Sequence, residues 1–294
     1  MSLPLRTNFE SHRVEADRFA IPVHVVHNLA ARHPVSAGTS EGFGNVKTRI
    51  EKIGRLKCRV VDNLPDETNP ELVVVLCHGY GASGSDLVPI GEELLDQSPS
   101  LHGRVQFVFP EAPLSLDDLG LPGGRAWWPI DLMKLQLAAA TGRFRDLQRR
   151  RPDGLVEARD RLIETLRLLN ERTGVGLSRF VLGGFSQGAM LSTDVALHLD
   201  VNPAALIALS GSLLNESEWQ ERAPLHPGLR VLQSHGSEDP LLPLASAEWL
   251  RDLLNGAGAA VEFVSFRGGH QIPFEVLERI AVLLESLAGE GIRP

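Results

Sequence analysis

The sequence predicts an α/β protein in which helices flank a mostly parallel central sheet, and three observations lead to this class. Short apolar or β-branched runs alternate with stretches of helical periodicity from about residue 55 onward. Several of these runs, such as LVVVLC and ALIALS, are apolar at nearly every position, which is typical of strands covered on both faces. Alternation of strands with helices also favours parallel pairing of the strands.

The expected elements follow one another in a regular order. Strands are predicted at LKCRVV, LVVVLC, VQFVFP, RFVLGG, AALIALS, LRVLQS and AVEFVSF. Helices are predicted at about 86–97, 156–172, 187–199, 245–255 and 273–288. In the second of these, Leu162, Ile163, Leu166 and Leu169 fall on one face, opposite charged residues. This order indicates one continuous sheet rather than two domains.

Composition narrows the class of protein further. The chain has 294 residues, 43% of them hydrophobic, and a formal net charge of −8. That apolar content excludes extensive disorder, and the acidic balance argues against a nucleic-acid partner. No apolar run reaches the ~18–20 residues of a membrane span, and the charged N-terminus lacks the apolar region of a signal peptide. We therefore expect a cytoplasmic protein in which Cys58 and Cys77 are reduced and buried.

Two segments fall outside the regular alternation. Residues 1–50 are expected to form an N-terminal arm, and residues 51–294 a single domain with an insertion at about 131–155. The arm holds histidines whose spacing matches no zinc site: His12, His24, His27 and His33. The insertion is Leu-rich at its start and then Arg-rich, with Arg143, Arg145, Arg149, Arg150 and Arg151. A solvated amphipathic helix is the simpler interpretation; a lid or a contact for an anionic substrate is the alternative.

A glycine-rich turn follows the strand LVVVLC. Gly79, Gly81 and Gly84 spell the G-x-G-x-x-G pattern of dinucleotide-binding loops, and Glu111 after the next strand is a candidate acid for a ribose. The residue before the first glycine is His78, for which a nucleotide site has no evident use. Both a nucleotide site and a tight turn that needs small residues are compatible with this segment.

A second motif follows the strand RFVLGG. Gly184-Phe185-Ser186-Gln187-Gly188 has the G-x-S-x-G pattern between a strand and a helix. Such a turn exposes a nucleophilic serine at strained backbone angles, so its flanking residues must be small. The helix that follows offers free backbone N–H groups beside the position of a forming oxyanion. Ser186 is therefore the candidate nucleophile.

A serine nucleophile needs a base, and the base needs an acid that fixes its tautomer. Asp239 and His270 each follow the end of a predicted strand, and Ser186, Asp239 and His270 occur in the chain order of α/β-hydrolases. Glu238 is the rival acid; we prefer Asp239 because the following Pro240 should fix the loop. His235 is the other imidazole nearby, and a structural role is expected for it.

Together these segments resemble the phospholipase/carboxylesterase family, which includes acyl-protein thioesterases. The resemblance covers residues 55–288 and rests on HGYGASGSDL, FPEAP, GFSQGAM, ALSG, HGSEDPLLP and GGH. It implies an α/β-hydrolase fold without a large cap domain and hydrolysis of carboxylic esters with short to medium acyl chains, or of acyl thioesters, lysophospholipids being an alternative substrate. It also implies no cofactor. We further expect no metal, a small-molecule substrate, and no nucleic acid or stable membrane insertion; both a monomer and a homodimer are compatible with the sequence.

The resemblance also assigns residues. It makes Ser186 the nucleophile, His270 the base and Asp239 its acid, with the backbone N–H groups of Tyr80 and Gln187 as the oxyanion hole. For the substrate pocket it implies Trp127, Trp128 and Leu241, with Leu242 beside them. Pro129 stands where the family often has an acid after two aromatic residues, so the function of that acid is not carried over to this chain.

Overall fold

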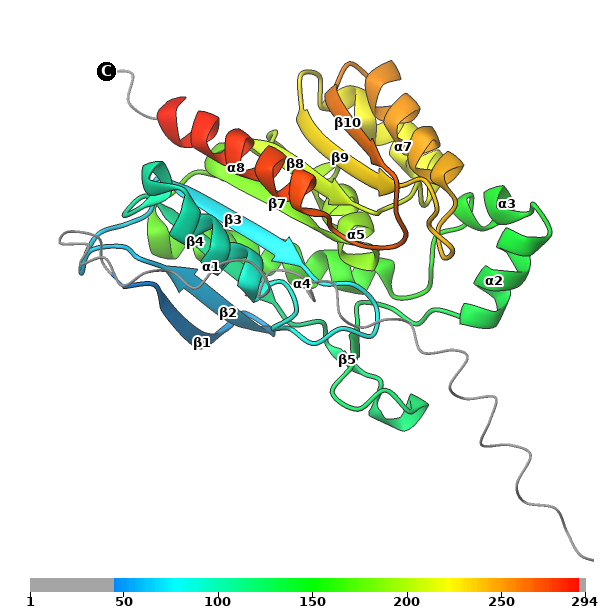
Figure 1. Cartoon of the computed structure of the whole chain (residues 1–294), viewed down its shortest axis with the longest axis horizontal. Coiled ribbons are helices and arrows are strands. Elements are labelled where there is room, and N and C mark those ends of the chain that lie inside the picture. The colour runs from blue at the N-terminus through cyan, green and yellow to red at the C-terminus, as the bar shows by residue number, and fades with distance from the viewer. Residues whose placement is uncertain (1–44, 291–294) are drawn as a thin grey trace, which may run out of the picture.

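One eight-stranded sheet with helices on both faces forms the body of the protein (Figure 1). The structure is a computed structural model that describes residues 45–290. The sheet order is β1-β2-β4-β3-β7-β8-β9-β10. The strands are β1 (Lys47–Ile53), β2 (Leu56–Asp62), β3 (Leu72–Cys77), β4 (Val105–Pro110), β7 (Phe180–Phe185), β8 (Ala205–Leu209), β9 (Arg230–Gly236) and β10 (Ala260–Phe266). Neighbours from β4 to β10 pair in parallel, whereas β2 is antiparallel to β1 and β4. The predicted class is confirmed.

Strand β1 is a difference from the sequence prediction. Its residues 47–50 fall in the range assigned to the N-terminal arm, yet they pair with β2 through a tight turn at Gly54, whose φ is +59°. The strand is at the sheet edge and mostly exposed, so its sequence KTRIEKI lacks the apolar run of a buried strand. The rest of the expected arm, residues 1–44 with His12, His24, His27 and His33, lies outside the described residues.

Two helical layers bury the two faces of the sheet. Helices α1 (Val88–Gln97) and α8 (Phe274–Gly289) cover one face; α4 (Leu155–Thr173), α5 (Gln187–Ala196) and α7 (Leu244–Gly256) cover the other (Figure 1). Strand β3 shows how one apolar run serves both layers. Val73, Val75 and Cys77 enter the core shared with α4 and α5, and the alternate residues enter the core shared with α1 and α8.

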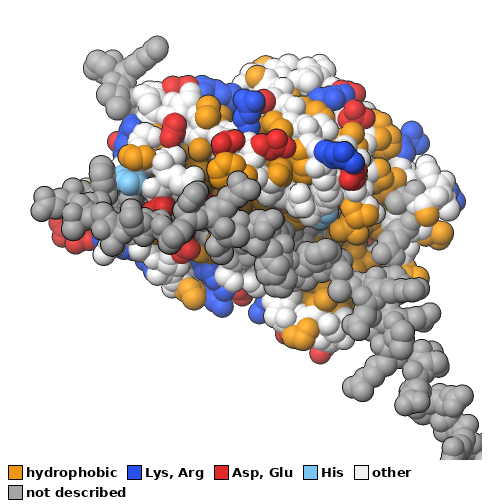
Figure 2. All heavy atoms as spheres, in the orientation of Figure 1, with side chains coloured by type: hydrophobic (Ala, Val, Ile, Leu, Met, Phe, Trp, Pro, Cys, Tyr) orange, Lys and Arg blue, Asp and Glu red, His pale blue; other side chains and the backbone are white. Residues whose placement is uncertain are grey.

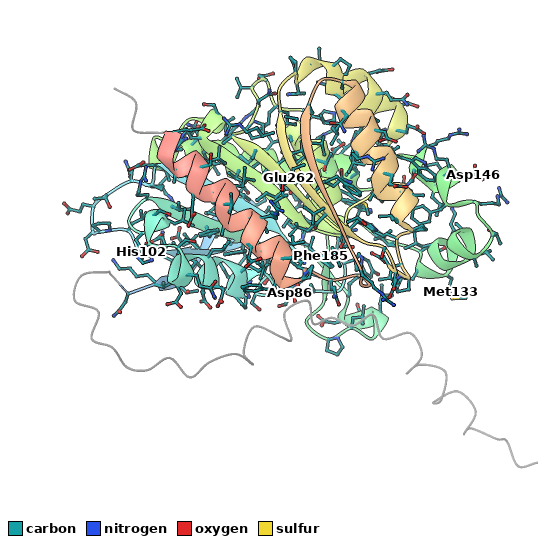
Figure 3. All side chains as sticks on the ribbon, turned by 45° about the horizontal axis from the view of Figure 1, so that its top comes forward. Asp86, His102, Met133, Asp146, Phe185 and Glu262 are labelled. Atoms are coloured by element: carbon teal, nitrogen blue, oxygen red, sulfur yellow. The ribbon has the colours of Figure 1, made fainter. Side chains whose placement is uncertain are left out.

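The insertion folds into two short helices, α2 (Leu132–Ala140) and α3 (Phe144–Gln148). They lie on the side of the molecule toward which the parallel strands point (Figure 1). Met133 on α2 and Asp146 on α3 mark this outlying segment in Figure 3. The segment is anchored by Arg145, which forms an ion pair with Glu216 on α6 (Glu216–Arg222) and lies 4.4 Å from the ring centre of Trp249 on α7.

Two remaining sequence predictions concern thiols and membranes. Cys58 and Cys77 are buried and unbridged, as predicted. None of the helices within residues 45–290 combines the length and apolar character needed to cross a bilayer. The face drawn in Figure 2 carries hydrophobic side chains interspersed with charges of both signs.

Candidate active site

Ser186 occupies a strained turn between β7 and α5. Its φ of 55° and ψ of −116° put a non-glycine residue in a region that L-residues rarely adopt. The conformation is held because the Ser186 N–H donates to the carbonyl oxygen of Leu209 at 2.8 Å, while the Ser186 carbonyl accepts from the Met190 N–H at 3.1 Å. Ser186 thus stands at the N-terminus of α5, where the first helical N–H groups have no acceptor within the helix.

The glycines of the G-x-S-x-G motif are required by close packing against β3. A Cβ on Gly184 would lie 2.3 Å from the carbonyl oxygen of Cys77, and one on Gly188 would lie 2.0 Å from the same atom. Both distances are far below van der Waals contact with a backbone atom that cannot turn aside. The motif therefore reflects the approach of this turn to β3 as well as the exposure of the serine.

Asp239 and His270 come together although they follow different strands. Nδ1 of His270 lies 2.6 Å from Oδ2 of Asp239. The other oxygen of Asp239 accepts the backbone N–H groups of Leu241 at 2.8 Å and Leu242 at 2.9 Å. Burial raises the pKa of the Asp239 carboxyl, but the bond with His270 and these two N–H groups outweigh it, so the pKa lies below its usual value. Asp239 is thus an ionised hydrogen-bond partner for the imidazole.

The rival residues have other surroundings. Glu238 is exposed and accepts a hydrogen bond from the Arg267 side chain at 3.0 Å. His235 is fully buried inside β9, where its Nε2 lies 2.8 Å from the Leu242 carbonyl oxygen and 3.4 Å from Oδ2 of Asp239. Burial lowers its pKa, and unlike His270 it does not line the cavity. The geometry accordingly brings Asp239, and not Glu238, to His270.

The glycine-rich loop borders the same serine. A Cβ on Gly79 would lie 3.4 Å from Cβ of Ser186, which is van der Waals contact, so the loop runs directly beside the serine. The His78 side chain fixes the loop from behind: its Nε2 accepts the Ala112 N–H at 3.0 Å, which leaves the proton on Nδ1 to be donated to the Gly79 carbonyl at 2.8 Å. Burial lowers the pKa of His78 to about 4, so the ring is neutral.

Gly84, the third glycine of the loop, packs against the side chains of Arg59 and Glu111. A Cβ on Gly84 would lie 2.4 Å from Nη1 of Arg59 and 2.7 Å from Cβ of Glu111. The Glu111 carboxylate accepts from Arg59 at 3.0 Å and lies 3.6 Å from Nζ of Lys57. The acid considered for a ribose is thus engaged by cations, Gly84 is required by packing, and Gly81 has a φ of +84° that favours glycine.

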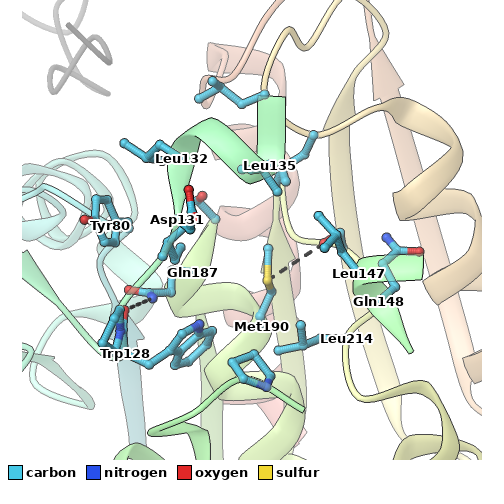
Figure 4. Close-up of a pocket in the computed structure, with 18 of the residues that line it drawn as sticks. Tyr80, Trp128, Asp131, Leu132, Leu135, Leu147, Gln148, Gln187, Met190 and Leu214 are labelled. Atoms are coloured by element: carbon cyan, nitrogen blue, oxygen red, sulfur yellow. Dashed lines mark hydrogen bonds between the residues drawn. The ribbon is translucent and has the colours of Figure 1, made fainter. Parts of the chain in front are cut away.

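The two tryptophans have different positions. Trp128 lines the cavity described below, but Trp127 is not among its lining residues. The Trp127 indole N–H donates to the His78 carbonyl at 2.9 Å, which ties it to the back of the glycine loop. The Gln187 side chain joins both. Its Oε1 accepts the backbone N–H of Trp127 at 2.9 Å, and its Nε2 donates to the Trp128 carbonyl at 2.8 Å (Figure 4).

Ser186 and His270 open into a cavity of about 640 Å³. Tyr80 and Gln187 line it too, so both expected oxyanion donors belong to the residues around the serine. Apolar side chains make up much of the rest of the wall, including Trp128, Met190, Leu213, Leu214, Leu241 and Leu242. Such a mixture of a few polar groups and an apolar wall suits a small molecule with a hydrocarbon part.

Both helices of the insertion belong to the wall of this cavity. Leu132 and Leu135 of α2 and Phe144, Leu147 and Gln148 of α3 line it (Figure 4). In place of one solvated amphipathic helix, the insertion forms two short helices that both contribute side chains to the cavity wall. Charged residues line the cavity in balanced numbers: Lys134, Arg150 and Arg151 against Asp86, Asp131 and Asp153. This balance gives no support to a site for an anion.

The sequence motifs assign no function to four side chains that support or line the site. They are the His78 imidazole and the Gln187 amide, which bond to neighbouring backbone groups, and Met190 and Gln148, which line the cavity. His78 had one available signal, because a histidine before a glycine loop needs an explanation. The others depend on contacts between segments that are distant in the sequence.

Comparison with known proteins gives consistent results. A sequence model described as phospholipase/carboxylesterase matches residues 59–287. Acyl-protein thioesterase 1 of Mycosarcoma maydis is 28% identical over 242 residues, which are 78% of this chain and 96% of that protein. For acyl-protein thioesterase 1 of Neurospora crassa the identity is 26%, over 70% of this chain and 83% of that protein.

Solved structures show the same relationship. The crystal structure of esterase PE8 is 27% identical with a TM-score of 0.64, covering 82% of this chain and 99% of that chain. The Bacillus cereus carboxylesterase has a TM-score of 0.59 at 18% identity, covering 81% of this chain and 95% of that chain, which is a likeness of fold.

Proposed function

Because the chain belongs to the phospholipase/carboxylesterase family and is on that ground an ester or thioester hydrolase of the α/β-hydrolase fold, we propose that Ser186, His270 and Asp239 are its catalytic triad. The observation that carries the proposal is the 2.6 Å contact between Nδ1 of His270 and Oδ2 of Asp239, beside the cavity that also holds Ser186 on its strained turn.

The proposed reaction has two halves. In the first, Oγ of Ser186 attacks the acyl carbon while Nε2 of His270 takes the hydroxyl proton, and Asp239 stabilises the resulting imidazolium. The tetrahedral oxyanion accepts hydrogen bonds from the backbone N–H groups of Tyr80 and Gln187. His270 then gives its proton to the leaving alcohol or thiol as the carbonyl re-forms on Ser186. In the second half, a water molecule loses a proton to His270 and attacks the acyl-enzyme; His270 then returns that proton to Oγ of Ser186 as the bond to the acyl carbon breaks and the acid leaves.

The substrate is proposed to be a carboxylic ester with a short to medium acyl chain, or an acyl thioester. The size and apolar wall of the cavity support an acyl group as its occupant. The names of the two fungal relatives support the thioester alternative. Pro129, at the position where the family often has an acid, lines the cavity beside Trp128.

The test combines activity with labelling of the nucleophile. Ser186→Ala is expected to lower kcat/KM for p-nitrophenyl butyrate by at least about 10³-fold and to abolish labelling by a fluorophosphonate. Ser178→Ala, at an exposed serine ahead of β7, is the matched control and should retain both. Parallel assays with p-nitrophenyl esters from acetate upward and with acyl thioesters measure the preference.

Two results would contradict the proposal. One is wild-type turnover by a folded Ser186→Ala protein. The other is a wild-type protein that binds NAD in a calorimetric titration and is not labelled by the fluorophosphonate. That result would mean that the glycine-rich loop binds a nucleotide.

A further inference from the structure

A buried glutamine side chain in the cavity is left without hydrogen-bond partners. Gln148 ends α3 and is 2% exposed. Among the side chains that the structure describes, neither its Oε1 nor its Nε2 has a hydrogen-bond partner, and the residue lines the same cavity as Ser186 and His270. In Figure 4 it lies on the opposite side of the cavity from Tyr80. An unpaired amide in such a place is costly for a folded protein.

The fold holds this amide where it is. Arg145, on the same short helix, is bound to Glu216 and lies over the Trp249 ring, so α3 is fixed against α6 and α7. Phe144, one turn before Gln148, is 5% exposed and lines the cavity too. Gln148 is therefore a fixed polar residue of the cavity wall, with the apolar Phe144 and Leu147 beside it on α3.

The two free atoms define the chemistry of the missing partner. Oε1 accepts a hydrogen bond and Nε2 donates one. A hydrocarbon chain satisfies neither atom, and a carboxylate satisfies only the donor. A hydroxyl group both donates and accepts, and it adds no charge to the cavity.

We propose that the acyl chain hydrolysed by this enzyme carries a hydroxyl group, which binds the side-chain amide of Gln148. The inference rests on the proposed function, since it identifies the substrate class of the Ser186 site. The apolar side chains around the amide contact the hydrocarbon part of the chain. Gln148 is in these terms a specificity-determining residue and takes no part in the bond-breaking steps.

The test compares p-nitrophenyl octanoate with its hydroxyoctanoate isomers, in which the hydroxyl group occupies successive carbons. For at least one isomer, the wild-type kcat/KM is expected to exceed that for octanoate by about tenfold. Gln148→Met, which keeps the length of the side chain but removes its hydrogen bonds, should bring this ratio close to one, with both substrates measured on the same preparation of the variant. Gln97→Met, at an exposed glutamine that ends α1, is the control and should keep the wild-type ratio.

Three outcomes would overturn the inference: no preferred isomer in the wild type, an unchanged ratio in Gln148→Met, or a large fall in its melting temperature, which would mean that the amide bonds within the protein. Gln148→Leu, which also lacks the amide, gives a second measurement of the ratio and should agree with Gln148→Met. Failure of the proposed function would give a different result from failure of this inference: octanoate hydrolysis by Ser186→Ala would then equal that by the wild type.

Discussion

Asp239 and Glu238 are adjacent in the sequence but face opposite environments, the first buried against His270 and the second exposed beside Arg267. The backbone conformation of the loop after β9 therefore decides which of the two carboxylates contacts the imidazole of His270. The consequence can be measured.

We expect Asp239→Asn to lower kcat/KM for p-nitrophenyl butyrate by about 10³–10⁴-fold, because an amide no longer stabilises the imidazolium or fixes its tautomer. Glu238→Gln is the matched control and should stay within about twofold of the wild type, since it removes only an exposed ion pair. The larger loss in Glu238→Gln would exchange the two assignments.

The buried His78 makes stability depend on pH. Its pKa in the folded state is about 4, below the value of 6.5 in an unfolded chain, so between these values the unfolded state binds the extra proton. Stability from this group is therefore lost as the pH falls from 6.5 toward 4. Between pH 7 and pH 4.5 the free energy of unfolding should fall by about 2–3 kcal/mol more in the wild type than in His78→Gln.

Denaturation in urea at the two pH values measures this difference. Equal pH dependence in the two proteins would show that His78 is not the group responsible. Because the same imidazole bonds to the Gly79 carbonyl, the variant should also have a lower kcat at pH 7, through a less well fixed Tyr80 N–H.

Gly188 illustrates a glycine that packing requires. Ala at this position would place Cβ 2.0 Å from the Cys77 carbonyl oxygen, and both atoms belong to rigid elements. We expect Gly188→Ala to lower the free energy of unfolding by at least about 3 kcal/mol. Gly256→Ala, at the end of α7 where a Cβ meets nothing within 4 Å, should instead be neutral or stabilising by up to about 1 kcal/mol. Thermal melting compares the two, and similar melting temperatures would refute the packing argument.

Arg145, which fixes α3 against α6 and α7, should affect the preference for acyl chain length more than the rate of the bond-breaking steps. Arg145→Ala removes the contacts with Glu216 and Trp249 that hold part of the cavity wall. We expect KM for p-nitrophenyl octanoate to rise about threefold to tenfold, with kcat for acetate within about twofold, because a short acyl group needs little of the wall. Arg143→Ala, which loses only an exposed pair with Asp146, is the control. An unchanged acetate-to-octanoate profile in Arg145→Ala, or in a folded protein lacking residues 131–155, would separate the insertion from substrate selection.

The sequence alone determined the α/β class, the buried strands and the serine turn. These features have local causes: a strand covered on both faces must be apolar along its length, and a tight turn must have small residues where backbones approach. The continuous apolar run of β3 and the glycines around Ser186 are therefore evident in the sequence itself.

Tertiary structure decided what depends on contacts between distant segments. It separated Asp239 from Glu238, put Trp128 in the cavity wall and Trp127 behind the glycine loop, and added the exposed strand β1 to the sheet edge. It also buried Gln148 without a partner, which no periodicity predicts. The physical reason is common to all of these: burial and hydrogen bonding belong to the surroundings of a side chain, and those surroundings exist only once the chain has folded.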